Sequence, residues 1–295
     1  FAGARIISYY PVSIPAHGVA LNVTVTGPTA ASHLTLWPWG ATRPSVSTPN
    51  FAEGQTVANG ATVVVGGADS IGIYNSAGDV HVVVDVVGYY ADATGAVGFT
   101  PATTPTRAVD SRTGVGGFTT PWGPGQVRSV RLAGVGAVPP AAAAVVVNLT
   151  AVAPTAATHV TAYPSGAARP RASTLNVAAG ETRPNLAVVK PSASGYVTLF
   201  NNSGEVDLVV DVFGWFSPGG YELHPVVPGR VLDSRNGTGW YRSPFGAGSW
   251  AFAAGRVGGV PPSARAALLN VTGTGPTATT HLTIWPDGAT KPHTS

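Results

Sequence analysis

The chain has 295 residues, of which only 10% are charged, and it contains 38 glycines and 26 prolines. It has no cysteine, which excludes disulfide bonds, thiolate metal sites and thiol catalysis. The net charge of +3 reflects scarce acidic residues rather than a basic cluster, so nucleic-acid binding is not expected. The most apolar stretches, such as 80–90, are far shorter than the roughly 20 residues of a membrane helix, so membrane insertion is not expected either.

Glycine, proline and runs of valine, alanine and threonine favour short strands joined by turns. We therefore expect an all-β protein. The chain opens at Phe1 and contains no methionine. This is typical of a processed mature protein or of a fragment, and with a cleaved signal peptide we expect an extracellular or cell-surface location.

One block of sequence occurs three times. The tetrapeptide Leu-Asn-Val-Thr around Asn22 returns, with aliphatic residues exchanged, around Asn148 and Asn270. The first two copies are 126 residues apart, and the second and third are 122 apart. From Asn22 to Asp85 the first copy aligns without a gap on the second, which ends this stretch at Asp211. A repeat of this length indicates one β module present three times.

The middle copy is complete and predicts eight strands separated by turn residues. Apolar runs at 145–147 and 208–210 mark two of them as central strands of a sheet. Eight short strands favour tandem antiparallel β-sandwich modules of a jelly-roll type, one complete and two partial. The predicted strands are 107–110, 127–132, 143–152, 159–163, 173–177, 185–189, 196–201 and 206–215.

Stretches of small residues after the last strand of each copy predict the module boundaries. Module one is expected at 1–90, module two at 99–216 and module three at 221–295. Module one lacks the segment equivalent to 107–117 that opens module two. Module three has that segment and stops before the last four strands, so two modules are expected to be partial.

Carboxylates recur on strands that are otherwise apolar. Asp85 and Asp211 each stand in a Val-Val-Asp-Val run, where an unpaired charge would be costly. Arginine is the obvious partner class, and the opening segment of a module supplies it.

That opening segment has the pattern Arg-x-x-Asp-Ser-Arg in modules two and three. Asp110 and Arg112, and likewise Asp233 and Arg235, are two residues apart and would share a face of a strand. We expect these to be structural ion pairs that tie a glycine-rich turn to the sheet. A catalytic carboxylate pair is the alternative, but no histidine, serine or second acid recurs at a fixed spacing near them. We therefore expect no catalytic residues, no metal site and no cofactor.

Two other polar positions recur. His33, His159 and His281 occur once per module without a second ligand at metal-binding spacing, which favours a structural hydrogen bond at a strand start. The repeated asparagine stands in an Asn-x-Thr glycosylation sequon, but inside an apolar strand where a glycan would not fit.

Aromatic residues recur beside proline at the end of one strand, as Trp37, Tyr163 and Trp285. Carbohydrate-binding modules use exposed rings as stacking platforms, which makes these three the candidate sugar-stacking residues. The other interpretation is that the rings cap the edge of the sandwich. Exposure of the rings distinguishes the two.

Together, these motifs resemble a β-rich module repeated in large secreted or surface proteins of high-GC actinobacteria. The resemblance covers nearly the whole chain. It implies an accessory or surface-display unit, sometimes beside cell-wall or polysaccharide enzymes, and it brings no active site. The residues that carry it are Leu21–Thr24, Val82–Tyr89, Arg169–Pro170, Val231–Arg235 and His281–Pro286.

Repetition without recognisable chemistry favours a non-enzymatic extracellular structural or adhesive protein. Self-association is the expected partnership, in a filament or surface layer built by strand complementation between chains. The alternative is a lectin-like accessory module that binds cell-wall or environmental polysaccharide. A hydrolase is the third interpretation and has no recurring catalytic pattern to support it.

Overall fold

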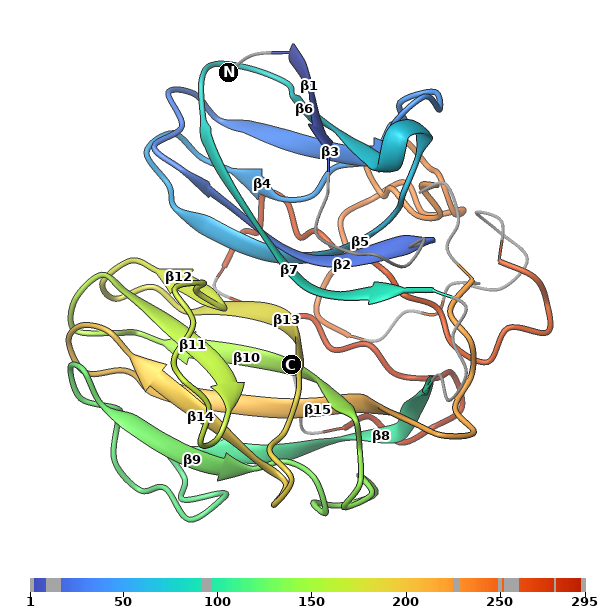
Figure 1. The fold of residues 1–295 in the computed structure, drawn as a ribbon. Coiled ribbons are helices and arrows are strands. Elements are labelled where there is room, and N and C mark those ends of the chain that lie inside the picture. The colour runs from blue at the N-terminus through green and yellow to red at the C-terminus, as the bar shows by residue number, and fades with distance from the viewer. Residues whose placement is uncertain are drawn as a thin grey trace.

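The computed structural model describes residues 3–8, 17–91, 97–224, 229–248, 251, 260–278 and 280–292. Within these residues the regular structure is strand, apart from one 3-10 turn at Gly67–Asp69, and the strands pair antiparallel. The all-β prediction is therefore confirmed. Figure 1 shows two sandwiches, with the orange-to-red trace of the third copy beside them. No helix in the described part of the chain is long and apolar enough to cross a membrane.

Module two is a complete eight-stranded jelly roll. Its sheets have the orders β13-β10-β15-β8 and β12-β11-β14-β9, and the chain passes between them in the manner of two Greek keys. β10 and β15, which contain the two apolar runs, are the central strands of their sheet. The strands are β8 (Gly98–Asp110), β9 (Val127–Arg131), β10 (Ala144–Val152), β11 (Thr158–Pro164), β12 (Leu175–Val177), β13 (Arg183–Val189), β14 (Tyr196–Asn201) and β15 (Asp207–Ser217).

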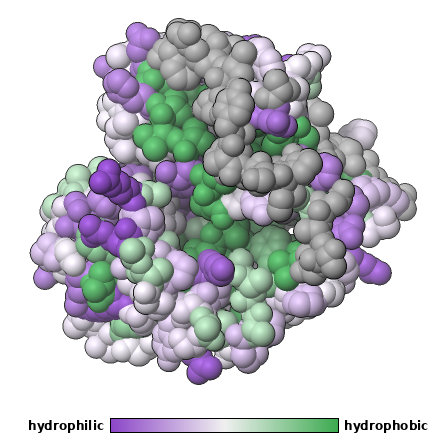
Figure 2. All heavy atoms as spheres, viewed as in Figure 1, coloured by the Kyte–Doolittle hydropathy of each residue, from purple (hydrophilic) through white to green (hydrophobic). Residues whose placement is uncertain are grey.

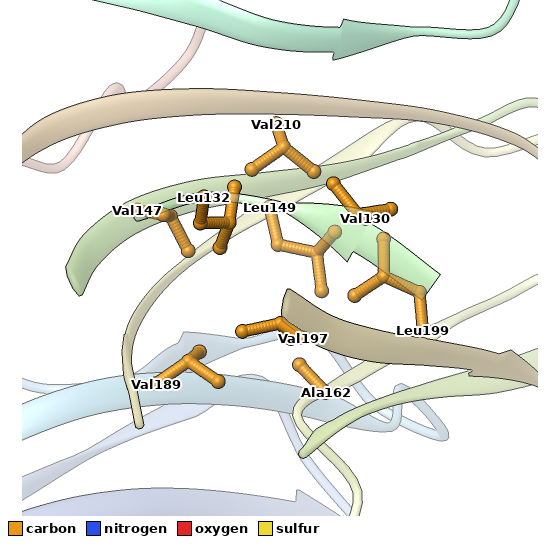
Figure 3. A pocket seen from close by; sticks show the side chains of 9 residues that line it. All are labelled: Val130, Leu132, Val147, Leu149, Ala162, Val189, Val197, Leu199 and Val210. Atoms are coloured by element: carbon orange, nitrogen blue, oxygen red, sulfur yellow. The ribbon is translucent and has the colours of Figure 1, made fainter. Parts of the chain in front are cut away.

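The two sheets of module two enclose an aliphatic core. Alternate side chains of each strand point inward, so Val147, Leu149 and Val210 of one sheet meet Val130 and Leu199 of the other (Figure 3). The hollow among them has a volume of about 10 Å³ and is lined by aliphatic side chains. A space about the size of one water without a polar partner is a packing gap rather than a ligand site.

Module one repeats this jelly roll with one strand fewer. Its sheets are β5-β2-β7 and β1-β6-β3-β4, which correspond strand for strand to module two except that no described strand lies beyond β7, where β8 lies in module two. The strands are β1 (Gly3–Ser8), β2 (Gly18–Thr26), β3 (Ser32–Pro38), β4 (Asn50–Phe51), β5 (Val57–Val64), β6 (Ser70–Asn75) and β7 (His81–Tyr90).

Module three differs from the sandwich expected of it. Its described residues, 221–224, 229–248, 251, 260–278 and 280–292, contain no strand, and their ladder-type contacts are single bridges such as Asp233 with Thr238. In module two the Asn-x-Thr strand β10 is paired on both sides, by β13 and β15. Neither pairing has an equivalent among the described residues of module three, so the segment around Asn270 has no ladder in which to form a strand.

We predict that Leu208→Ala destabilises module two by about 2–5 kcal/mol, because Leu208 is 0% exposed in the core and its loss leaves a cavity. Leu268→Ala is the matched control, since Leu268 is 57% exposed and its truncation should cost less than about 0.5 kcal/mol. Urea unfolding of the two variants measures the difference. Equal midpoints for both would contradict the assigned core.

Candidate functional site

The most highly connected polar cluster closes module two between its first and last strands. Arg107 on β8 places Nε 2.8 Å from Asp211 Oδ1 and Nη2 3.2 Å from Asp211 Oδ2, a two-pronged contact with a side chain that is 0% exposed. The same guanidinium donates from Nη1 to Asp110 Oδ2 at 3.0 Å. Arg112 holds Asp110 from the other side, at 2.9 Å and 2.7 Å. Arg107 therefore links the carboxylates of two neighbouring strands.

The charges of this cluster are mutually stabilised. The Arg112 hydrogen bonds lower the pKa of Asp110 below its ordinary value, against the opposing effect of burial. The hydrogen bond to Asp211 likewise raises the pKa of Arg107. A carboxylate held ionised by two guanidinium groups has no proton to donate at neutral pH, so the geometry suits a structural clamp rather than an acid-base pair.

The opening segment of module three forms the same local structure without a last strand beside it. Arg235 donates to both oxygens of Asp233 at 2.9 Å and 2.7 Å, and Arg230 donates to Asp233 Oδ2 at 2.7 Å. These bonds lower the pKa of Asp233. Glycine at the close of each turn has positive φ, +81° at Gly116 and +77° at Gly239, and a Cβ there would meet a backbone oxygen at 2.5 Å or 2.7 Å. The turn is thus encoded within the segment itself.

Arg107 and Arg230 are the functional residues that the sequence analysis did not single out. The detectable signal was their place three residues before each aspartate in both copies of the opening segment. The importance of Arg107 depends on its contact across the sheet to Asp211, which lies 104 residues away in the sequence. Local spacing does not identify such a partner.

Asp85 occupies the position of Asp211 in module one, in an otherwise different environment. It pairs with Asn22 across the ladder, as Asp211 pairs with Asn148, but no ion pair involving Asp85 occurs among the residues that the structure describes. Burial raises its pKa. The ion pair expected for Asp85 from the sequence is therefore not found among the described residues, because no described strand lies beside β7 to carry an arginine to it.

The outer edge of β7 is also apolar. Val83, Val86, Val87 and Tyr89 are between 37% and 48% exposed, whereas Val209 and Val212, which correspond to Val83 and Val86, are each 2% exposed in module two. Figure 2 shows apolar residues reaching the surface in the middle of the visible face, between the upper and lower sandwiches of Figure 1. An open edge with an apolar border and a desolvated carboxylate is a site that favours an added strand.

The candidate sugar-stacking residues are not arranged as a platform. Trp37 and Tyr163 are buried, at 5% and 8% exposed, and Trp285 is half-buried. The Trp37 ring lies against Gly72, where a Cβ would come within 2.6 Å of it. Rings buried to this extent present no open face to a sugar in this structure, which disfavours the stacking role of Trp37 and Tyr163. Both rings alternate with core residues along their strands and so lie on the outer face of their sheets.

Two of the recurring histidines, His33 and His159, lie where burial and nearby cations oppose protonation. Burial, followed by the charges of Arg230 and Arg43, lowers the pKa of His33, and burial followed by Arg169 lowers that of His159. Neutral imidazoles at strand starts fit the structural role. No group of three or more histidine, aspartate or glutamate side chains in the described segments could hold a metal ion.

Comparison with known proteins gives no relative, because no family model matches the chain and no curated protein matches it.

We predict that Arg107→Ala destabilises module two by about 3 kcal/mol or more, since it leaves the buried Asp211 carboxylate without its cation. Arg131→Ala is the control, because Arg131 lies on the other sheet of the sandwich and forms no ion pair among the described residues. Hydrogen exchange on β15 measures the effect. Unchanged protection of β15 would contradict the clamp.

Opposite pH dependences are expected for the two modules. The lowered pKa of Asp110 means that its unfolded form binds protons first, so module two loses stability as the pH falls below the ordinary value of 3.8. The raised pKa of Asp85 means that the folded form binds protons first, so its contribution to module one improves as the pH falls toward that pKa. At neutral pH, Asp85→Asn should therefore stabilise module one, whereas Asp110→Asn should destabilise module two.

Hydrogen exchange of β7 and β15 in the wild type and in both variants, in dilute protein from pH 7 to pH 3, separates these two contributions. A change in stability of the same sign for Asp85→Asn and Asp110→Asn at neutral pH would contradict the assignment.

Proposed function

We propose that this chain is a non-enzymatic extracellular structural or adhesive repeat protein that self-associates by adding a strand of one copy to an open sheet edge of another. The observation that carries the proposal is the outer edge of β7, beside which no described strand takes the place that β8 has beside β15 in module two. The proposed occupant is the opening segment of module three, residues 229–239, from a second copy.

The register of module two shows how such a strand would fit. β8 places Arg107 opposite Asp211 and Val109 opposite Val210. Carried onto β7, this register sets Arg230 opposite Asp85 and Leu232 opposite Val84. An arginine would then meet the carboxylate that lacks one, and a leucine would cover a valine that is only partly buried against the core of module one.

Three properties of the two surfaces favour this pairing. The charges are complementary, because Asp85 has no described cation and Arg230 has no equivalent of Asp211. The segment carries its own turn, held by Asp233 and Arg235, which lowers the ordering entropy of docking. Backbone groups along a free edge gain ladder hydrogen bonds when a strand is added. The proposed extracellular location rests on the resemblance of the repeated motifs to modules of secreted and surface proteins.

Analytical ultracentrifugation of the full chain over a range of concentrations tests the proposal. We expect wild-type protein to form dimers or longer assemblies. Asp85→Arg should weaken association by at least tenfold, about 1.4 kcal/mol, because it sets two cations opposite each other. Glu53→Arg is the matched control, since Glu53 is an exposed carboxylate of module one away from β7.

Cross-linking identifies the occupant of the edge. Chains carrying Asp85→Cys are mixed with chains carrying Arg230→Cys, and a disulfide between them is the expected product, with Glu53→Cys as the control partner. A wild-type chain that stays monomeric at all concentrations would overturn self-association. A β7 edge that cross-links to some segment other than 229–239 would overturn the assigned occupant.

A further inference from the structure

The repeated asparagine makes a contact that none of the preceding assignments uses. Asn22 Nδ2, on the outer face of the β5-β2-β7 sheet, donates to the backbone oxygen of Ser173 in module two at 2.7 Å. Asn185 Nδ2 on β13 donates to Asn22 Oδ1 at 2.9 Å, and Asn185 Oδ1 accepts from the Gly60 amide at 3.0 Å. Asn22 is 6% exposed and Asn185 is 2% exposed. The two modules are therefore joined by a buried, mutually satisfied polar network.

The same contact occurs a second time, between modules three and one. Asn270 Nδ2 donates to the backbone oxygen of Ser47 at 2.7 Å, and Asn59 Nδ2 donates to Asn270 Oδ1 at 3.2 Å. Within the repeat, Asn270 is equivalent to Asn22, Ser47 to Ser173, and Asn59 to Asn185. Donor and acceptor roles are the same in both contacts. A chance approach of an irregular segment would not reproduce two hydrogen bonds on equivalent atoms.

The remaining pair of modules is also in contact at the corresponding place. Thr290, Lys291 and Pro292 of module three line one surface hollow with 104–107 of β8 in module two. Lys291 is equivalent to Arg169 of module two and Arg43 of module one. The charges of Arg230 and Arg43 both act on His33, so the Arg43 loop of module one lies near the opening segment of module three. The Lys291 loop of module three lies in the same way near the opening segment of module two.

We infer that the outer sheet face around the Asn-x-Thr asparagine is a docking surface for another module of the same repeat, and that the modules close into a ring. Two of the three contacts use this asparagine: the face around Asn22 meets module two, and Asn270 of module three meets module one. The third contact joins 104–107 of module two to the Lys291 loop of module three. Such head-to-tail contacts either continue without limit or close, depending on the rotation between modules. Figure 1 shows the third copy lying beside both sandwiches, as a closed arrangement requires.

This role explains two sequence features. Gly60 lies where β5 approaches module two, and a Cβ there would meet the Leu186 oxygen at 2.6 Å, so a side chain would separate the modules. The Asn-x-Thr sequon at Asn22 is unsuited to a glycan, because its amide nitrogen is buried and donates to Ser173. The hydrogen bonds of the buried asparagine thus determine which neighbouring surface can dock on this face.

Engineered disulfides in the full chain test the ring, because the natural sequence has no cysteine to interfere. All variants carry Asp85→Arg, so that strand addition is suppressed and the two proposals fail separately. The pairs are Asn22→Cys with Asn185→Cys for the first contact and Asn59→Cys with Asn270→Cys for the closing contact. Asn22→Cys with Asn202→Cys is the control, since Asn202 lies in an exposed hairpin of module two.

We expect both test pairs to oxidise within one chain, at least tenfold more completely than the control, as measured by mass spectrometry of peptides from non-reduced monomer. A 59–270 disulfide that is no more abundant than the control, or that forms only between chains, would overturn ring closure. As a second readout, Asn185→Ala should speed hydrogen exchange of the Gly60 amide at least tenfold, whereas Asn176→Ala should not. An unchanged exchange rate of the Gly60 amide would overturn the role of the asparagines in the contact between modules.

Discussion

A carboxylate in the middle of an apolar strand is the constraint on which this structure depends. Asp211 is 0% exposed on the central strand β15, and an ion there is tolerated only with a cation and satisfied hydrogen bonds. Arg107 supplies both, and it does so from β8, the first strand of the module. The need to pair this charge therefore fixes which strand closes the sheet and in which register. Asp110 and Arg112 extend the pairing into the glycine-rich turn that follows.

Module one has the same kind of carboxylate, Asp85, but no described cation pairs with it. β7 aligns with β15 without a gap and is identical to it at five of ten positions, including the carboxylate, and yet no described strand lies along its outer edge. Asp85 consequently has a raised pKa, and the valines around it are exposed. An edge of this kind combines unpaired backbone groups, apolar area and a desolvated charge, three costs that one added strand would remove together. Self-association is proposed because the repeat itself contains the strand that fits.

Interactions between modules follow a second rule, based on neutral rather than charged groups. An amide side chain donates and accepts at once, so Asn22 and Asn185 satisfy each other and a backbone oxygen without burying a charge. Equivalent bonds at Asn270 show that the rule belongs to the repeat rather than to one pair of modules. The outer face of the β5-β2-β7 sheet is thereby covered by module two, which is why β2 is buried on both faces although only one faces its own core.

The sequence by itself determined the all-β class, the three copies of the module and the approximate positions of the eight strands of module two, because strand periodicity and turn residues are local properties. It did not predict that β8 begins at Gly98, nine residues before the expected start at Arg107. It also indicated the Asp110–Arg112 and Asp233–Arg235 pairs, since residues two apart share a strand face. Only the tertiary structure decided that Trp37 and Tyr163 are buried, that Arg107 rather than Arg112 reaches Asp211, and that no described cation pairs with Asp85. Those outcomes depend on which strands become neighbours across a sheet, and neighbours more than 100 residues apart leave no local pattern. The role of the repeated asparagine was hidden for the same reason, because its partners lie on another module.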